Sequence, residues 1–210
     1  MKHQLFPQIQ SYCEERITEF HLIPQERKEN LQSIAEYIRY KHQENKVIQL
    51  VYVCTNNSRR SHFGQIWGAV AASYFNRSRV FTYSGGTEPT AFHPNALEAI
   101  QRIGFVVAVL VKSSNPHYDV QYGEGLTTSC FSKTYNDNSN PKENFAVIMT
   151  CSDADENCPF IQNVELRIST TYKDPKVFDG TLQQDEQYDE RCGQIARENL
   201  YMFSVIDKSL

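Results

Sequence analysis

Residues 51–61 read Val51-Tyr52-Val53-Cys54-Thr55-Asn56-Asn57-Ser58-Arg59-Arg60-Ser61. The apolar run at 47–53 is typical of a buried strand, and the residues after Ser61 follow a helical pattern. We therefore expect a strand, a tight loop and the start of a helix. This arrangement presents backbone N–H groups to a tetrahedral oxyanion.

Cys54, at the first position of this loop, would place a thiol against the bound anion. The loop N–H groups and the helix dipole are expected to lower its pKa, so that a thiolate is present near neutral pH. Arg60 can donate two N–H groups to the anion. A cysteine and an arginine separated by five residues occur by chance in many chains, but the preceding strand and Ser61 make the pattern specific.

The composition limits the class of protein. The chain has 210 residues, 40% of them hydrophobic, and a formal charge of −4. This indicates a globular protein without a basic face for nucleic acid. No apolar run is long enough for a membrane span, and the first residues lack the apolar core of a secretory signal. We therefore expect a cytoplasmic protein whose six cysteines are reduced.

Helical and strand patterns alternate along the chain. Residues 1–46 predict two helices divided near Pro24, the second at about 25–43, which pack as an extension on the core of the protein. Beyond them, we expect strands at 47–53, 79–83, 105–111 and 145–150, and helices at 60–75, 93–103 and about 185–206. The alternation predicts an α/β fold with a mostly parallel sheet covered on both faces. Cys54 would lie at the carboxyl edge of the sheet, where ligands bind in such folds.

Residues 112–144 interrupt this pattern, because they are polar and rich in Asn and Ser. We expect an irregular insertion, either a lid over the site or a surface excursion.

A second pair of cysteines comes after the strand at 145–150. Cys151 would reach the same sheet edge as Cys54, and Cys158 lies seven residues later. Zinc would need a second pair of ligands, and a calcium loop would need Gly at Cys158 and Glu at Val164. Two interpretations of Cys151 and Cys158 remain: they are ordinary cysteines of the core, or they take part in thiol–disulfide exchange. In a helix the Cα atoms of Cys151 and Cys158 would be about 10 Å apart, whereas a disulfide needs about 7 Å or less. A disulfide between them would therefore require this segment to unwind.

Several motifs resemble one family. The loop from Cys54 to Ser61 resembles that of the low-molecular-weight protein tyrosine phosphatases, and is closer to that of the thioredoxin-coupled arsenate reductases. Residues 83–87 and 93–100 are similar to the family's second strand and second helix. Residues 151–159 resemble the redox segment of the reductases, and Tyr172-Lys173-Asp174-Pro175 resembles the motif that supplies the general acid. The resemblance covers residues 47–206.

The resemblance implies a flavodoxin-like three-layer fold, with a four-stranded central sheet in a catalytic domain at 47–210. It implies an oxidoreductase of arsenical resistance in which Cys54 attacks arsenate and Asp174 protonates the departing oxygen. Cys151 and Cys158 then pass on a disulfide that thioredoxin reduces. It also implies that the oxyanion is bound by Arg60 and by the loop residues Thr55, Asn56, Asn57, Ser58, Arg59 and Ser61, with Ser84 supporting the loop.

The chain departs from the family at three positions. Asn56 replaces the usual Gly, and Asn tolerates a left-handed backbone. Arg59 replaces a cysteine outside the relay and would add positive charge near the anion. Gln65 replaces a Glu that helps some relatives to hold potassium, so we expect neither a metal site nor a cofactor.

Two other functions use the same loop. A phosphatase would act on phosphotyrosine or a small phosphate ester with Cys54, Arg60 and Asp174, and would not need Cys151 or Cys158. A binding module would sense oxyanions or redox state without turnover. We place His62 on an exposed face of its helix.

Overall fold

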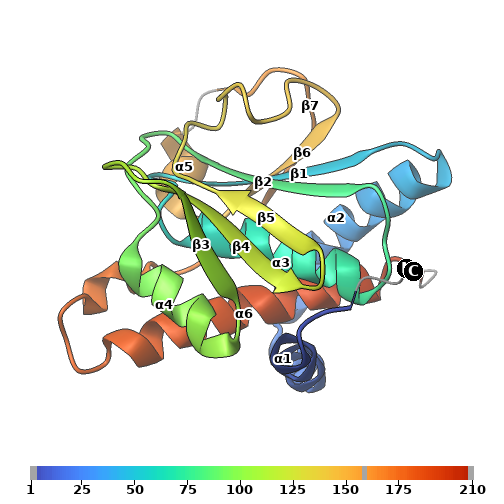
Figure 1. The fold of residues 1–210 in the computed structure, drawn as a ribbon. Coiled ribbons are helices and arrows are strands. Elements are labelled where there is room, and N and C mark those ends of the chain that lie inside the picture. The colour runs from blue at the N-terminus through green and yellow to red at the C-terminus, as the bar shows by residue number, and fades with distance from the viewer. Residues whose placement is uncertain (1–3, 158–159, 208–210) are drawn as a thin grey trace.

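The computed structural model describes residues 4–157 and 160–207. Its central sheet has four parallel strands in the order β2 (Val80–Gly86), β1 (Ile48–Cys54), β6 (Phe145–Met149) and β7 (Val164–Ser169). Figure 1 shows the sheet from its side. The two central strands are almost wholly buried, as expected for parallel strands covered on both faces.

The two faces of β1 contact different layers. Leu50 and Tyr52 belong to a large apolar core with α3 (Arg60–Tyr74) and α6 (Gln184–Ser204). Val51 and Val53 belong to a smaller cluster with the short helix α5 (Ser152–Asn157), on the opposite side in Figure 1. Helices therefore cover both faces of the sheet, and the predicted three-layer α/β fold is confirmed.

The N-terminal helices are α1 (Pro7–Thr18) and α2 (Gln25–Gln43), joined by a short 3-10 helix at Phe20–Leu22. Both pack against α6, and their buried Ile9, Leu31 and Ile38 lie in the large core. The two helices are thus part of one packed body with the rest of the chain. A domain boundary near residue 46 remains a prediction.

A second sheet lies beyond α4 (Pro94–Ile103). It contains β3 (Val106–Val111), β4 (His117–Gly123) and β5 (Leu126–Cys130), all antiparallel. The prediction that 112–144 is irregular is therefore wrong for 117–130, whereas 131–144 contains no helix or strand. Alternating β-favouring residues on β4 and β5 bury Val120, Tyr122 and Cys130 toward the core, and Gly125 turns the chain with φ = 67°.

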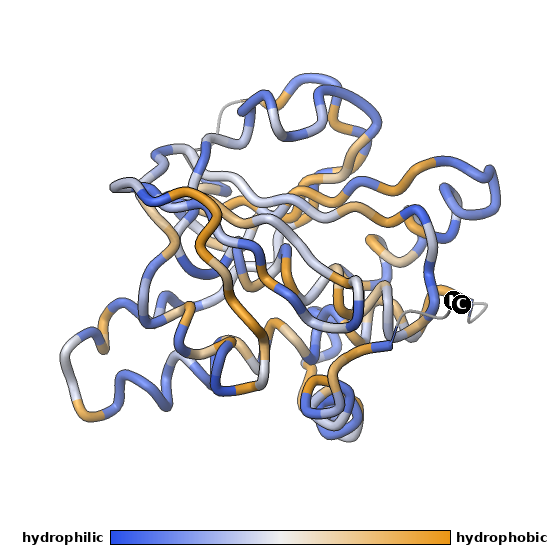
Figure 2. Tube along the Cα trace, in the orientation of Figure 1, coloured by the Kyte–Doolittle hydropathy of each residue, from blue (hydrophilic) through white to orange (hydrophobic). Residues whose placement is uncertain are grey.

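The predicted strand at 105–111 exists as β3, but it belongs to this second sheet. The fourth strand of the central sheet is β7, which the sequence pattern did not predict. Hydrophobic residues run along β3 (Figure 2), yet Val106, Val109 and Leu110 are about half exposed. β3 lies at the edge of its small sheet, whereas the predicted role needed a strand covered on both faces.

The helices of the described residues include none long and apolar enough to cross a membrane.

Candidate active site

The loop from Cys54 to Arg60 connects the carboxyl end of β1 to the start of α3, as predicted. The Cys54 thiol is buried, and its Sγ lies 3.0 Å from Oγ of Ser61. Asn57 donates from Nδ2 to the same hydroxyl at 2.8 Å. The Ser61 hydroxyl therefore links the Cys54 thiol to the side chain of Asn57, in the middle of the loop.

The loop's carbonyl groups are bound by residues outside it. The carbonyl of Asn56 accepts from the hydroxyl of Ser132 at 3.1 Å, and that of Ser58 accepts from the N–H of His93 at 2.9 Å. Within residues 4–157 and 160–207, the N–H groups of Asn56 to Arg59 have no hydrogen-bond acceptor. A loop with its carbonyls bound outside and its amides unpaired is suited to an oxyanion.

Asn57, rather than Asn56, has the left-handed backbone, with φ = 44°. The expectation that Asn56 needs this conformation is therefore wrong. The Asn57 side chain is fully buried, and its Oδ1 accepts from the N–H of Lys133 at 2.8 Å. The segment after β5 thus holds the loop in place through this hydrogen bond.

Arg60 and Asp174 lie together, although 114 positions separate them. Arg60 donates from Nη2 to Oδ2 of Asp174 at 2.6 Å and from Nη1 to the carbonyl of Tyr172 at 2.8 Å. Its buried Nε has no partner among the described residues. The guanidinium predicted to bind the anion and the carboxyl group predicted to be the acid are therefore in direct contact.

A small cavity of about 10 Å³ is lined by Cys54, Asn56, Ser58, Arg59, Arg60 and Asp174. This volume suits about one water molecule. An oxyanion in this cavity would lie beside both members of the ion pair between Arg60 and Asp174.

The guanidinium of Arg59 is bonded to other residues of the protein. Its Nε donates to the hydroxyl of Tyr188 at 2.6 Å, and its Nη2 pairs with Asp179 at 3.0 Å. The expected contribution of Arg59 to the charge around the anion is thus largely neutralised by Asp179.

Cys151 follows β6, the strand beside β1, after one intervening residue, Thr150, and is buried in the same apolar cluster as Cys54. Its Sγ lies 3.3 Å from the hydroxyl of Thr55, the residue after Cys54, and accepts from the N–H of Ala154 at 3.4 Å. Two of the three predicted redox thiols therefore lie at the same sheet edge, in one apolar cluster. Cys158 lies outside the described residues.

Ser84 is buried, and its hydroxyl lies 3.2 Å from Nδ1 of His62. His62 is fully buried and stacks on Phe92, so the expectation of an exposed position is wrong. Burial, and next the charge of Lys133, hold the pKa of His62 well below 6.5. Ser84 and His62 form a polar pair at the base of α3, beneath the loop.

Four residues near the loop were not predicted from the sequence: His62, Lys133, Asp179 and Tyr188. Asp179 comes only a few residues after the predicted Asp174-Pro175 motif, which is a usable signal. The sequence carried no signal for Lys133 or Tyr188. The position of Lys133 depends on the second sheet, and that of Tyr188 depends on the packing of α6.

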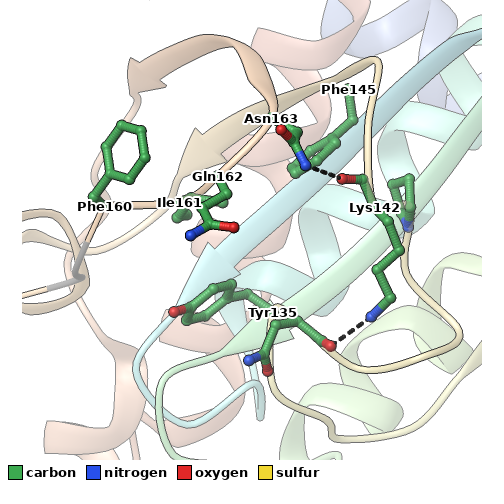
Figure 3. A pocket seen from close by; sticks show the side chains of 9 residues that line it. Tyr135, Lys142, Phe145, Phe160, Ile161, Gln162 and Asn163 are labelled. Atoms are coloured by element: carbon green, nitrogen blue, oxygen red, sulfur yellow. Dashed lines mark hydrogen bonds between the residues drawn. The ribbon is translucent and has the colours of Figure 1, made fainter.

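A larger pocket of about 370 Å³ lies between residues 135–145 and 160–163 (Figure 3). Lys142 lines this pocket and donates to the carbonyl of Asn136 at 2.7 Å, and Phe160, which also lines it, is 84% exposed. None of the predicted site residues lines this pocket.

No protein-family model matches the chain. Arsenate reductase 2 of Staphylococcus saprophyticus is 29% identical over 113 residues, which are 53% of this chain and 66% of that protein. The arsenate reductase of Staphylococcus aureus strain Newman is 30% identical over 111 residues, covering 52% of this chain and 65% of that protein. The match thus spans just under two thirds of the length of these relatives.

Solved structures share the fold. An arsenate reductase in the phosphate-binding state has a TM-score of 0.51 at 17% identity, covering 77% of this chain and 100% of the other. A low-molecular-weight phosphotyrosine phosphatase from Vibrio cholerae O395 has a TM-score of 0.50 at 15% identity, covering 77% and 97%. These likenesses concern the fold, whereas the curated relatives concern the sequence. The chain is therefore similar in sequence to curated arsenate reductases, and similar in fold to arsenate reductases and low-molecular-weight protein tyrosine phosphatases.

Proposed function

We propose that the protein is an arsenate reductase in which Cys54 is the nucleophile and Cys151 resolves the arsenic adduct. The observation that carries this proposal is the position of Cys151, whose Sγ lies 3.3 Å from the hydroxyl of Thr55, next to Cys54. A phosphatase does not need a second thiol there.

Binding begins when arsenate displaces Asp174 from Arg60. The guanidinium then bonds the anion together with the N–H groups of residues 56–59. This exchange keeps the buried positive charge of Arg60 compensated by a negative partner. Asp174, released from Arg60, can take up the proton that it later donates.

The Cys54 thiolate attacks arsenic and forms a sulfur–arsenic bond. The bond from arsenic to one oxygen breaks, and Asp174 gives that oxygen a proton so that it leaves as water. The Ser61 hydroxyl, 3.0 Å from the Cys54 sulfur, stabilises the thiolate before the attack.

The Cys151 thiolate next attacks the Cys54 sulfur. A disulfide forms, the sulfur–arsenic bond breaks, and its electron pair reduces arsenic(V) to arsenic(III), which leaves as arsenite. Cys158 then attacks Cys151 and frees Cys54. Thioredoxin in the cytoplasm is the proposed reductant of the resulting disulfide between Cys151 and Cys158.

A phosphatase is the second candidate, favoured by the pairing of Arg60 with Asp174 at 2.6 Å. These two residues and Cys54 suffice to cleave a phosphate ester, with water resolving the phosphocysteine. A non-turnover oxyanion or redox sensor is the third, and it fits the narrow cavity.

The test is arsenate-dependent NADPH oxidation with thioredoxin and thioredoxin reductase, beside hydrolysis of p-nitrophenyl phosphate. We expect arsenate turnover in the wild type, and its loss in Cys151→Ser and Cys158→Ser. Ester hydrolysis that survives in both variants, without arsenate turnover in the wild type, would identify a phosphatase. Phosphate binding without either activity would identify a sensor.

A further inference from the structure

Arg59, Asp179 and Tyr188 form a closed triangle of hydrogen bonds, which we name the Arg59 clasp. Arg59 donates to the Tyr188 hydroxyl at 2.6 Å and to Oδ2 of Asp179 at 3.0 Å. Tyr188 donates in turn to Oδ1 of Asp179 at 2.7 Å. The clasp therefore joins the oxyanion loop, the segment after Asp174 and helix α6.

Two further residues contact the carboxylate of Asp179 in the clasp. Asn95 donates to Oδ1 of Asp179 at 3.1 Å, and Nε2 of His93 lies 3.7 Å from Oδ2. Burial favours a raised pKa for Asp179, but the bond from Tyr188 and the charge of Arg59 outweigh it, so the pKa is lowered. Tyr188 is fully buried. Asp179 is thus an ionised anchor held by several donors.

Two consecutive arginines hold the two ends of one short element. Arg60 pairs with Asp174, immediately before the 3-10 helix Pro175–Phe178, and Arg59 pairs with Asp179, immediately after it. Pro175 at the start of this helix is buried and the helix contacts α6, whereas Val177 is 76% exposed. The two ion pairs therefore connect both ends of this helix to the oxyanion loop.

The two ion pairs differ in what a bound anion does to them. An anion bound in the cavity that Arg60 and Asp174 line would compete with Asp174 for the Arg60 guanidinium. The guanidinium of Arg59 bonds Tyr188 and Asp179, and we expect it to keep both partners when the anion binds. We propose that the Arg59 clasp is the positioning device that keeps Asp174 over the leaving oxygen after Arg60 has exchanged to the substrate.

This inference rests on the proposed function only for the role of Asp174 as acid. Its physical basis is that a general acid works only within hydrogen-bond reach of the leaving atom. A displacement of about 1 Å can cost on the order of 100-fold in rate. In this proposal the side chains of Arg59, Asp179 and Tyr188 act through Asp174, and Arg59 contacts the anion only through its backbone N–H.

The test uses Tyr188→Phe, which removes the hydroxyl and keeps the buried ring, and Asp179→Asn. Asp189→Asn is the matched control, because Asp189 lies on the same helix and pairs with Arg102 at 2.7 Å, outside the clasp. The first readout needs no activity: amide hydrogen exchange of residues 175–183 in the substrate-free protein. The second is the affinity for inorganic phosphate, measured by calorimetry.

We expect exchange at 175–183 to be about tenfold faster or more in both clasp variants and unchanged in the control, since the clasp holds this segment locally. Phosphate affinity should stay within about twofold, because Arg60 and the loop amides bind the anion. Arsenate turnover should show kcat reduced about tenfold or more at an unchanged KM, with a shallower fall of kcat at high pH.

Unchanged exchange in both clasp variants would overturn the proposal. A loss of phosphate affinity as large as the loss of kcat would overturn it too, because Arg59 would then belong to the anion site. If the wild type reduces no arsenate, the proposed function fails, while exchange and phosphate binding still decide whether the clasp holds the segment.

Discussion

At the scale of single residues, His62 links stability to pH. The folded protein keeps its imidazole neutral because the pKa lies well below 6.5, whereas the unfolded chain takes up a proton near 6.5. Below pH 6.5 the unfolded state therefore binds more protons, and the free energy of unfolding falls as pH falls, by up to about 1.4 kcal/mol per pH unit from this group.

His62→Gln should flatten this dependence between pH 6.5 and 5, measured by urea unfolding. His21→Gln is the control, because His21 is exposed. An equally steep dependence in His62→Gln and the wild type would contradict a neutral, buried His62.

Asn57 provides a second prediction at this scale. Asn57→Ala would keep the left-handed φ without the amide and would leave the N–H of Lys133 without its acceptor. We expect a loss of about 2–4 kcal/mol in the free energy of unfolding, from backbone strain and an unpaired buried donor. Asn56→Gly should change stability by less than about 1 kcal/mol, since Asn56 has no positive φ. A marked gain of stability in Asn56→Gly would argue that Asn56 carries the strain.

Several residues of the predicted site lie together in the structure, because they follow one another in sequence or lie at the ends of adjacent strands. Cys54, Arg60 and Ser61 share one strand–loop–helix unit, and Cys151 comes after the neighbouring parallel strand. The position of Arg59 could not be predicted, because its partners Asp179 and Tyr188 are more than a hundred positions away. The buried His62 was missed because nearly every side chain at the start of α3 is buried, and a single amphipathic stripe is absent there.

At the scale of elements, Asp155 anchors α5 to β7, while Ala154 packs in the apolar cluster beneath the helix. Arg167 donates to both the carbonyl and the carboxylate of Asp155, at 2.7 and 3.2 Å, and Ser169 donates to the same carboxylate. The proposed relay requires this helix to unwind before Cys151 reaches Cys158. The anchor of Asp155 on β7 therefore opposes the last thiol exchange.

Asp155→Ala should speed formation of the disulfide between Cys151 and Cys158 about threefold or more under a mild oxidant, by removing an interaction of roughly 1 kcal/mol. Mass spectrometry of quenched samples gives the rate. Glu156→Ala, at a position on the same helix outside this anchor, should leave it unchanged. A slower rate in Asp155→Ala would mean that α5 must stay folded for the exchange.

Elements with strong periodicity were predicted well, and those whose pattern depends on tertiary contacts were not. The helix at 25–43 and the strands β1, β2 and β6 occur near the predicted positions. β4 and β5 were missed because their polar Thr, Ser and Gln side chains resemble a loop. β7 was missed because it is a short edge strand of mixed polarity, stabilised by its pairing with β6.

At the scale of the whole molecule, the N-terminal helices complete the core. Ile9, Leu31, Ile34 and Ile38 are buried against the rest of the chain. Each such side chain contributes roughly 1.5–3 kcal/mol when buried, which together rivals the total stability of about 5–15 kcal/mol of a typical domain. A chain that begins at Val47 should therefore aggregate or lose its cooperative thermal transition. A transition temperature equal to that of the full chain would show that 1–46 is a dispensable attachment.

The central claim is that arsenate drives a disulfide between Cys54 and Cys151, and it can be tested by trapping that bond. Cys158→Ser removes the thiol that would resolve the disulfide. The variant is incubated with arsenate, alkylated and digested for peptide mass spectrometry. We predict that arsenate, but not phosphate, joins the Cys54 peptide to the Cys151 peptide with release of one arsenite per disulfide. Both peptides recovered alkylated after arsenate would contradict the account.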